Sequence, residues 1–187
     1  QNPCDPVAIY SLSMQTVGRK AGRSPIAALA YRFAIKAFDA RCNVFHDYRK
    51  RSDRNRIEVF NVLPKTAPRS FHDPVNLWNA ADAAEKHPRA RTAREIRIAL
   101  PHELPAWDQM DLCQSFCDRL VDRYGIGISG AIHPPSSDVG ADERNVHAHL
   151  MLTTRRINSE GFGKKVRKLD DIVQGPEELE WIRETWA

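Results

Sequence analysis

The chain has 187 residues, which is long enough for one domain with a sizeable hydrophobic core. Hydrophobic residues make up 42% and charged residues 28%, and no apolar run reaches membrane-spanning length, so the composition predicts a soluble globular protein. The four cysteines lack zinc-site spacing and no signal peptide is visible, which predicts free thiols in a cytoplasmic protein.

The net charge of +4 is distributed unevenly along the chain. Residues 1–37 carry five basic side chains against one acidic, and residues 155–168 carry six against one. Residues 170–187 reverse the sign, with six acidic side chains against one basic. Basic segments kept apart from an acidic tail predict a polyanionic partner, with a solvated basic loop as the alternative for either cluster.

The N-terminal region is predicted to contain a strand followed by a basic loop. Residues 1–6 have no apolar pattern and no initiator Met, which indicates a leader or a remnant of expression, so the folded domain is predicted over residues 7–187. Residues 7–13 read as a strand. Residues 17–24 form a loop whose glycines permit close approach and whose cations suit phosphates.

The first helix is predicted to begin at Ser24 and Pro25, an N-cap followed by proline at the first helical position, and to end near Ala37. Its apolar stripe has spacings of three and four and comprises Ile26, Leu29, Ala30, Phe33, Ala34 and Ala37. Tyr31 lies about 130° from the centre of this stripe, beside alanines. It is therefore either an ordinary surface tyrosine or a side chain placed to reach an external substrate.

The middle of the chain is predicted to be rich in strands. Residues 37–48 read as a hairpin that turns near Asn43, and residues 57–63 read as a further strand. Residues 73–87 read as a capped helix. His46 is either a substrate contact or an ordinary loop histidine.

Residues 92–100 alternate between two faces, as a strand does when only one side meets an aliphatic core. One face carries Ile96, Ile98 and Leu100, with Arg94 in the same parity. On the other face, Glu95 could orient a metal-binding histidine or accept a proton. The alternative is a salt bridge from Glu95 to Arg97 or another cation.

Two later strands are predicted to place three histidines on one face. In residues 146–153 the period of two aims His147 and His149 at the same side. In residues 127–133, His133 falls on the face opposite the isoleucines. Three neutral imidazoles from adjoining strands can bind a divalent cation and leave positions open for substrate, whereas a polar cluster without metal is the alternative.

The remaining segments complete the predicted fold. Residues 106–124 form the strongest helical pattern and predict core packing, with Gly125 ending the helix. Residues 155–168 are predicted to form a basic hairpin or loop able to clasp DNA, and residues 176–186 a short acidic helix. This order predicts an α+β fold, an antiparallel β-sheet flanked by helices in a two-layer sandwich whose ionisable face stays open.

Two motifs carry a resemblance to a known family. The first is Ala8-Ile-Tyr-Ser-Leu-Ser13 followed by Gly22-Arg-Ser-Pro-Ile-Ala-Ala-Leu-Ala-Tyr-Arg32, and the second is Ala131-Ile-His133 with Asn145-Val-His-Ala-His-Leu-Met-Leu-Thr-Thr-Arg155. Together they resemble the motifs of HUH endonucleases, and most closely the MobA/MobL family of plasmid mobilisation relaxases. Glu95, on a strand before Ala99-Leu-Pro101, also fits the family pattern. The resemblance spans residues 7–186 and implies the palm fold of HUH relaxases.

The resemblance implies a site- and strand-specific DNA relaxase. Tyr31 would be the catalytic nucleophile, leaving a 5′-phosphotyrosyl link and a free 3′-hydroxyl, and Glu95 would be a base or a histidine-orienting group. A divalent metal would be held by His133, His147 and His149. Nitrogen ligands favour Zn, Mn, Co or Ni, while the family keeps Mg in the set.

The implied partner is single-stranded or hairpin DNA at an origin of transfer, together with accessory relaxosome proteins. Larger relaxases of this type can carry a C-terminal helicase or primase domain. The candidate phosphate contacts are the cations of the basic segments: Arg19, Lys20, Arg23, Arg32, Arg155, Arg156, Lys164, Lys165, Arg167 and Lys168. Two alternatives remain, an HUH replication-initiator nickase and a non-catalytic basic DNA-binding module.

Overall fold

A computed structural model describes residues 11–51, 56–135, 140, 142 and 144–187. Within these residues, five antiparallel strands form a main sheet in the order β1-β5-β7-β6-β4, and two short hairpins stand apart from it. The strands of the main sheet are β1 (Leu12–Gly18), β4 (Glu58–Val62), β5 (Arg91–Ala99), β6 (Ile128–His133) and β7 (His147–Thr153). The hairpins are β2 (Lys36–Asp39) with β3 (Val44–Asp47), and β8 (Arg155–Asn158) with β9 (Gly161–Lys165).

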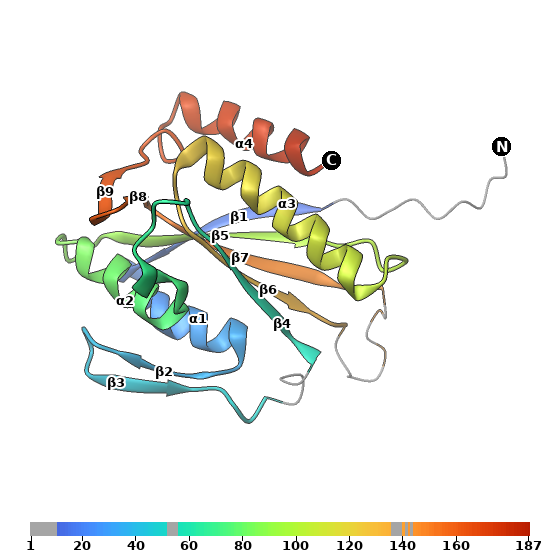
Figure 1. The fold of residues 1–187 in the computed structure, drawn as a ribbon, viewed down its shortest axis with the longest axis horizontal. Helices are drawn as coiled ribbons and strands as arrows, with labels where there is room; N and C mark the ends of the chain where they lie inside the picture. The colour runs from blue at the N-terminus through green and yellow to red at the C-terminus, as the bar shows by residue number, and fades with distance from the viewer. Residues whose placement is uncertain (1–10, 52–55, 136–139, 141, 143) are drawn as a thin grey trace, which may run out of the picture.

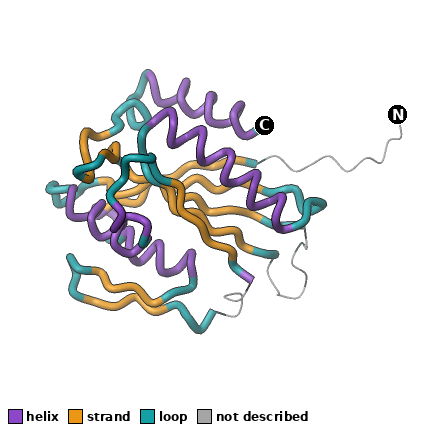
Figure 2. Tube along the Cα trace, in the orientation of Figure 1, coloured by secondary structure: helices purple, strands orange, loops and turns teal. Residues whose placement is uncertain are grey.

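Helices lie on both sides of the main sheet (Figure 1). The four helices of the described part are α1 (Pro25–Phe33), α2 (Pro74–Ala84), α3 (Ala106–Tyr124) and α4 (Gln174–Trp186). Figure 2 shows α3 and α4 together on one side and α1 and α2 on the other. No described helix is both long and apolar enough to cross a membrane. The predicted leader, residues 1–6, lies outside the described residues, as does the start of the predicted first strand.

One core fills the space between the sheet and α3 with α4. Its strand residues have the parity predicted from the sequence, with Ile96 and Ile98 of β5 packed beside Leu150 of β7. Arg94 shares this parity and is 1% exposed. Its guanidinium is neutralised by Asp170 at 2.6 Å and also donates to the carbonyl of Val166 at 2.8 Å. The buried charge therefore fastens the segment before α4 to the sheet.

A second core lies under α1 and α2. These helices pack on the small or flexible side chains of the opposite face, including Ala93, Ala131 and Met151. The indole of Trp78 donates to Ser129 at 2.9 Å and ties α2 to β6. The predicted α+β fold and antiparallel sheet are thus confirmed. Helices α1 and α2 cover part of the ionisable face, while Gln15 and Arg97 on that face remain exposed.

The predicted element boundaries are confirmed in the long helix and shift near the first one. Helix α3 spans the predicted residues and ends at Gly125, whose φ of 65° is left-handed. Helix α1 ends at Phe33 rather than near Ala37, because Ala34 takes a left-handed φ of 50°. Strand β1 continues to Gly18, two residues into the loop predicted over residues 17–24. The hairpin turn near Asn43 is confirmed, with φ at 55°.

Gly130 is the position in β6 where a side chain cannot be accommodated. It pairs with Phe60 of β4, and a Cβ built on Gly130 would lie within 3 Å of three atoms of the Phe60 ring. The ring occupies the space above the glycine in the α3-side core. The edge strand is thereby held in register by an aromatic side chain that covers bare backbone.

Gly130→Ala is expected to lower the free energy of unfolding by about 1–3 kcal/mol, because the added methyl group forces Phe60 out of its place. Denaturant unfolding followed by circular dichroism measures the change. Gly163→Ala in β9 is the matched control, since a Cβ there meets its nearest atom at an ordinary 3.5 Å. Equal destabilisation by the two substitutions would contradict this account of Gly130.

Candidate active site

Three histidines meet where β6 ends and β7 begins. His133 is paired in register with His147, and Ala131 with His149, so all three rings stand on the same side of the sheet. The ring centroids are 4.9–5.6 Å apart. One ring nitrogen from each histidine lies within 4.8 Å of the other two. The predicted common face is confirmed, and the three residues together could hold a metal ion.

Both histidines of β7 direct one nitrogen at an oxygen that can only accept. His149 donates Nδ1–H to Glu95 at 2.9 Å, and His147 donates Nδ1–H to the carbonyl of Asn145 at 3.1 Å. When either ring carries a single proton, these bonds place that proton on Nδ1. The Nε2 lone pair of each is left for a metal ion.

His133 is fixed in the same way from a different direction. Its Nε2–H donates to the main-chain carbonyl of Arg32 at 2.8 Å, which leaves Nδ1 with the lone pair. Burial lowers the pKa of His133 and of His147 to about 4. Both rings are thus neutral at physiological pH. Neutral imidazoles with oriented second nitrogens fit a divalent cation such as Zn, Mn, Co or Ni.

Glu95 is the carboxylate behind the histidines, and only 2% of it is exposed. It accepts hydrogen bonds from His149 at 2.9 Å, from Arg32 at 3.0 Å and from Gln15 at 3.2 Å. Burial alone would raise the pKa of Glu95, but the bonds from His149 and Arg32 outweigh it and bring that pKa to about 2. The sequence left open a salt bridge from Glu95 to Arg97 or to another cation, and in the structure that cation is Arg32. A carboxylate this acidic orients a histidine well and is a weak proton acceptor.

Tyr31 projects from α1 toward solvent. The helix starts at the Ser24 cap, whose hydroxyl accepts from two main-chain amides, and its buried side faces the second core. Tyr31 is 43% exposed. Its ring meets Tyr48 edge-on at 5.3 Å, and the guanidinium of Arg51 lies 4.3 Å from the ring centroid. The phenol is therefore held from the side while its outer part remains accessible.

Arg32 connects the tyrosine helix to the histidine cluster by two routes. Its carbonyl accepts from His133, and its guanidinium forms two hydrogen bonds with Glu95, which binds His149. The residue next to Tyr31 thus touches one histidine directly and a second through one carboxylate. Arg32 was expected from the sequence to contact phosphate, but its guanidinium faces Glu95 instead.

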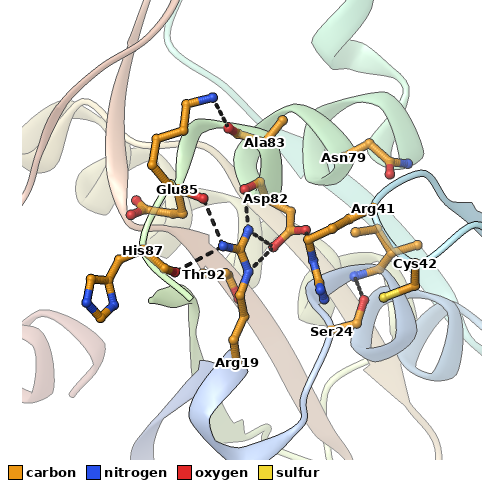
Figure 3. A network of polar contacts seen from close by, with 12 residues as sticks. Arg19, Ser24, Arg41, Cys42, Asn79, Asp82, Ala83, Glu85, His87 and Thr92 are labelled. Carbon is orange, nitrogen blue, oxygen red and sulfur yellow. Dashed lines mark hydrogen bonds and ion pairs between the residues drawn. The ribbon is translucent and has the colours of Figure 1, made fainter. Parts of the chain in front are cut away.

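The other predicted cations of the N-terminal segment differ in their surroundings. Arg19 donates to the carboxylate of Asp82 at 2.9 Å and to the carbonyls of Glu85 and His87, as Figure 3 shows. Lys20 and Arg23 are exposed. Arg23 also lines a cavity of about 320 Å³ that runs along α1. The same cavity is lined by Gln15, Ala27, Ala28, Arg32 and Glu95, among other residues.

The cations predicted to clasp DNA lie on and after the β8–β9 hairpin. Arg155 and Lys165 both pair with Glu85, and Lys168 pairs with Glu178 at 2.9 Å. Exposed members of the set are Arg156, Lys164 and Arg167. The hairpin follows the C-terminal end of β7, whereas His147 and His149 lie at or near its N-terminal end, about 20 Å away along the strand.

The sequence assigned no site role to Arg51 or Arg97, and it left His46 as either a substrate contact or an ordinary loop histidine. Arg51 reaches back to Tyr31, donating to its carbonyl at 2.8 Å, and no sequence periodicity connects a loop to a helix in this way. Arg97 is on the same face of β5 as Glu95, and the spacing of two residues in the sequence was enough to predict this. His46 lies 3.5 Å from Asp39 within the β2–β3 hairpin, a local contact.

Comparison with known proteins places the chain in a family. A sequence model described as the MobA/MobL family matches residues 23–185. The chain belongs to the MobA/MobL family. It is 32% identical over 186 residues to the mobilization protein MobL of Acidithiobacillus ferridurans, covering 89% of this chain and 48% of that protein. It is 33% identical over 150 residues to a 43 kDa relaxation protein of Salmonella typhimurium, covering 80% and 35%.

A solved structure is similar along almost the whole MobA/MobL chain. That structure, described as "Molecular Basis of Vancomycin Resistance Transfer in Staphylococcus aureus", superposes with a TM-score of 0.79 and 25% identity, covering 96% of this chain and 91% of that one. The family resemblance seen in the two sequence motifs is therefore supported by the fold. The chain spans about half, or less, of the curated relatives it matches.

The neutral histidines give the protein a predictable pH dependence when metal is removed by a chelator. The folded-state pKa of His133 and of His147 is about 4, against an ordinary 6.5. Between these values the unfolded chain binds more protons, so the free energy of unfolding should fall as pH decreases from about 6.5 to 4. Each histidine contributes at most about 1.4 kcal/mol per pH unit.

Denaturant titrations at several pH values measure this slope. His147→Gln, which removes one titrating ring, should make the decline between pH 6.5 and 4 shallower than in the wild type. His72→Gln is the control, since His72 is exposed on the surface. An unchanged slope in the His147 variant would contradict the buried, neutral state of this ring.

Proposed function

We propose that this MobA/MobL domain is a relaxase of the HUH type that nicks one strand of DNA at an origin of transfer during plasmid mobilisation. The observation that carries the proposal is the double connection through Arg32 between Tyr31 and the three-histidine cluster. It joins a potential nucleophile to a potential metal centre within one rigid arrangement. The names of the relatives, mobilization and relaxation proteins, agree with this role.

The proposed reaction is a transesterification on Tyr31. The phenol loses its proton, its oxygen forms a bond to the scissile phosphorus, and the bond from phosphorus to the 3′ oxygen breaks. The released 3′ oxygen takes up a proton, which leaves a 5′-phosphotyrosyl link. One phosphodiester replaces another, so the same site can rejoin the strand by the reverse reaction.

His133, His147 and His149 would hold a divalent cation, and such a cation would supply charge neutralisation at the phosphate. The chain's own groups prepare this site. Glu95 keeps His149 in the tautomer that presents Nε2, and the carbonyl of Arg32 does the same for His133 with Nδ1. Because Glu95 is committed to Arg32 and His149, we assign it an orienting role rather than that of the base.

The proposed DNA surface uses the cations whose charges are not taken up by carboxylates. Lys20 and Arg23 lie exposed before α1, and Arg156, Lys164 and Arg167 lie exposed near β8 and β9. Contacts to phosphate from such groups give affinity that falls with salt and carries little sequence preference. Sequence or hairpin selectivity would come from contacts to bases. Accessory relaxosome proteins would be partners of the complete protein.

Tyr31→Phe is expected to abolish the covalent protein–DNA adduct while leaving stability and oligonucleotide affinity nearly unchanged. The substitution removes only the attacking oxygen of a side chain that is 43% exposed. The measurement is denaturing electrophoresis after incubation with single-stranded origin-of-transfer oligonucleotides. Tyr48→Phe, which alters the ring packed edge-on against Tyr31, and Tyr124→Phe in α3 are the controls. An adduct that persists in the Tyr31 variant would assign the nucleophile elsewhere.

Removal of the cation is expected to stop nicking reversibly. Excess EDTA should abolish cleavage, and added divalent ion should restore it. Without the cation, the neutral histidines cannot compensate the negative charge of the phosphate. His149→Ala should lower cleavage at least about a hundredfold without unfolding the domain, since His149 is only partly buried. Full nicking in excess EDTA would exclude a metal from the mechanism.

A further inference from the structure

Arg97 lies beside the histidine cluster and has no role in the arrangement described so far. It is on β5, two residues after Glu95, and its register partner on β7 is His149. Direct partners on antiparallel strands have Cβ atoms about 5 Å apart and point to the same side. Arg97 therefore stands on the histidine face, where it is exposed.

The charge of Arg97 is not balanced within the described part of the chain. No hydrogen bond or ion pair joins its guanidinium to another described residue, whereas Arg32 on the same face is paired with Glu95. Its register partner on β1 is Ser13, which is uncharged.

An uncompensated arginine next to a cation-binding cluster is electrostatically unfavourable unless an anion lies between them. The guanidinium of Arg97 and a cation on the histidines would repel each other. An anion bound between them would be attracted by both charges and would offset this repulsion. Arginine presents a planar fork that matches two oxygens of a phosphate. Arg97 is exposed and the rings of His147 and His149 are half-buried, so a phosphate in solvent can approach them from the same side of the sheet.

We propose that Arg97 binds the non-bridging oxygens of the scissile phosphate, whose charge a cation held by the histidines would also neutralise. The inference rests on the proposed function and adds a substrate-contacting residue to it. Attack by a phenolate places a second negative charge on the phosphate group in the transition state, and Arg97 compensates that additional charge. Arg32 cannot take this role because Glu95 neutralises it.

Arg97→Gln is expected to raise the affinity for Mn²⁺ and to lower the affinity for DNA. Without DNA, Arg97→Gln removes a repulsion, so Mn²⁺ should bind about two- to fivefold more tightly than in the wild type. With Mn²⁺ bound, the same variant should bind the dinucleotide dTpdT about tenfold more weakly, because a charge-assisted contact to phosphate is lost. A residue that only supported the fold would not change the two affinities in opposite directions.

The experiment uses Mn²⁺ and dTpdT, so that neither a nick sequence nor the covalent step is needed. Electron paramagnetic resonance counts bound Mn²⁺, and broadening of the dTpdT phosphorus resonance by bound Mn²⁺ follows dinucleotide affinity. Arg97→Lys should keep the wild-type Mn²⁺ affinity and recover only part of the dinucleotide affinity. Arg119→Gln, an exposed arginine of α3 on the other side of the sheet, should match the wild type in both measurements.

Unchanged dTpdT affinity in Arg97→Gln, or an equal loss in Arg119→Gln, would overturn the proposal. A wild-type protein that binds no Mn²⁺ would overturn it as well, together with the metal part of the proposed function. The nucleophile is tested separately by Tyr31→Phe. If that variant loses the adduct while Arg97→Gln binds dTpdT normally, the inference fails and the proposed function stands.

Discussion

The negative charge of Glu95 is the constraint on which the site depends. A carboxylate that is 2% exposed loses most of its hydration, a cost of several kcal/mol that only fixed partners can offset. Its partners come from three other elements: Gln15 from β1, Arg32 from α1 and His149 from β7. Satisfying this one group therefore fixes the tyrosine helix against the histidine strands. Removing Arg32 would leave a buried charge unpaired, so its effect would exceed that of losing an ordinary surface arginine.

The two faces of the strands were predictable from the sequence because β-structure alternates with a period of two. That rule put His147 and His149 on one face, and with β5, β6 and β7 taken as members of one sheet it put His133 and Glu95 on the same side. The sequence could not predict the hydrogen bond that His133 donates to the carbonyl of Arg32, which spans 101 residues and depends on how α1 crosses the sheet. Helix packing angles follow from side-chain shapes in three dimensions, and a one-dimensional pattern does not contain them.

The predicted DNA-contacting cations show a second limit of reading charge from sequence. Several of these cations form ion pairs with carboxylates that are distant in the chain. Arg19 pairs with Asp82, and Arg155 and Lys165 pair with Glu85. Composition counts these charges as basic segments, but ion pairs across the fold remove them from the surface potential. Arg97 is the converse case. It is a single cation on β5, outside the basic segments, and it places an uncompensated charge beside the histidine cluster.

The strand order of the main sheet also determines when during synthesis the site can form. In the order β1-β5-β7-β6-β4, only β6 and β7 are neighbours both in sequence and in space. The bond from Gln15 to Glu95 closes a separation of 80 residues, and β5 in turn requires β7 as its other neighbour. Such non-local pairing folds slowly, since chain entropy is lost before contacts compensate for it. As a ribosome releases the chain from its N-terminus, Tyr31 emerges early but acquires its histidine partners only after residue 149 has been added. A truncated translation product that ends before residue 147 would contain Tyr31 and lack two of the three histidines proposed to hold the metal ion.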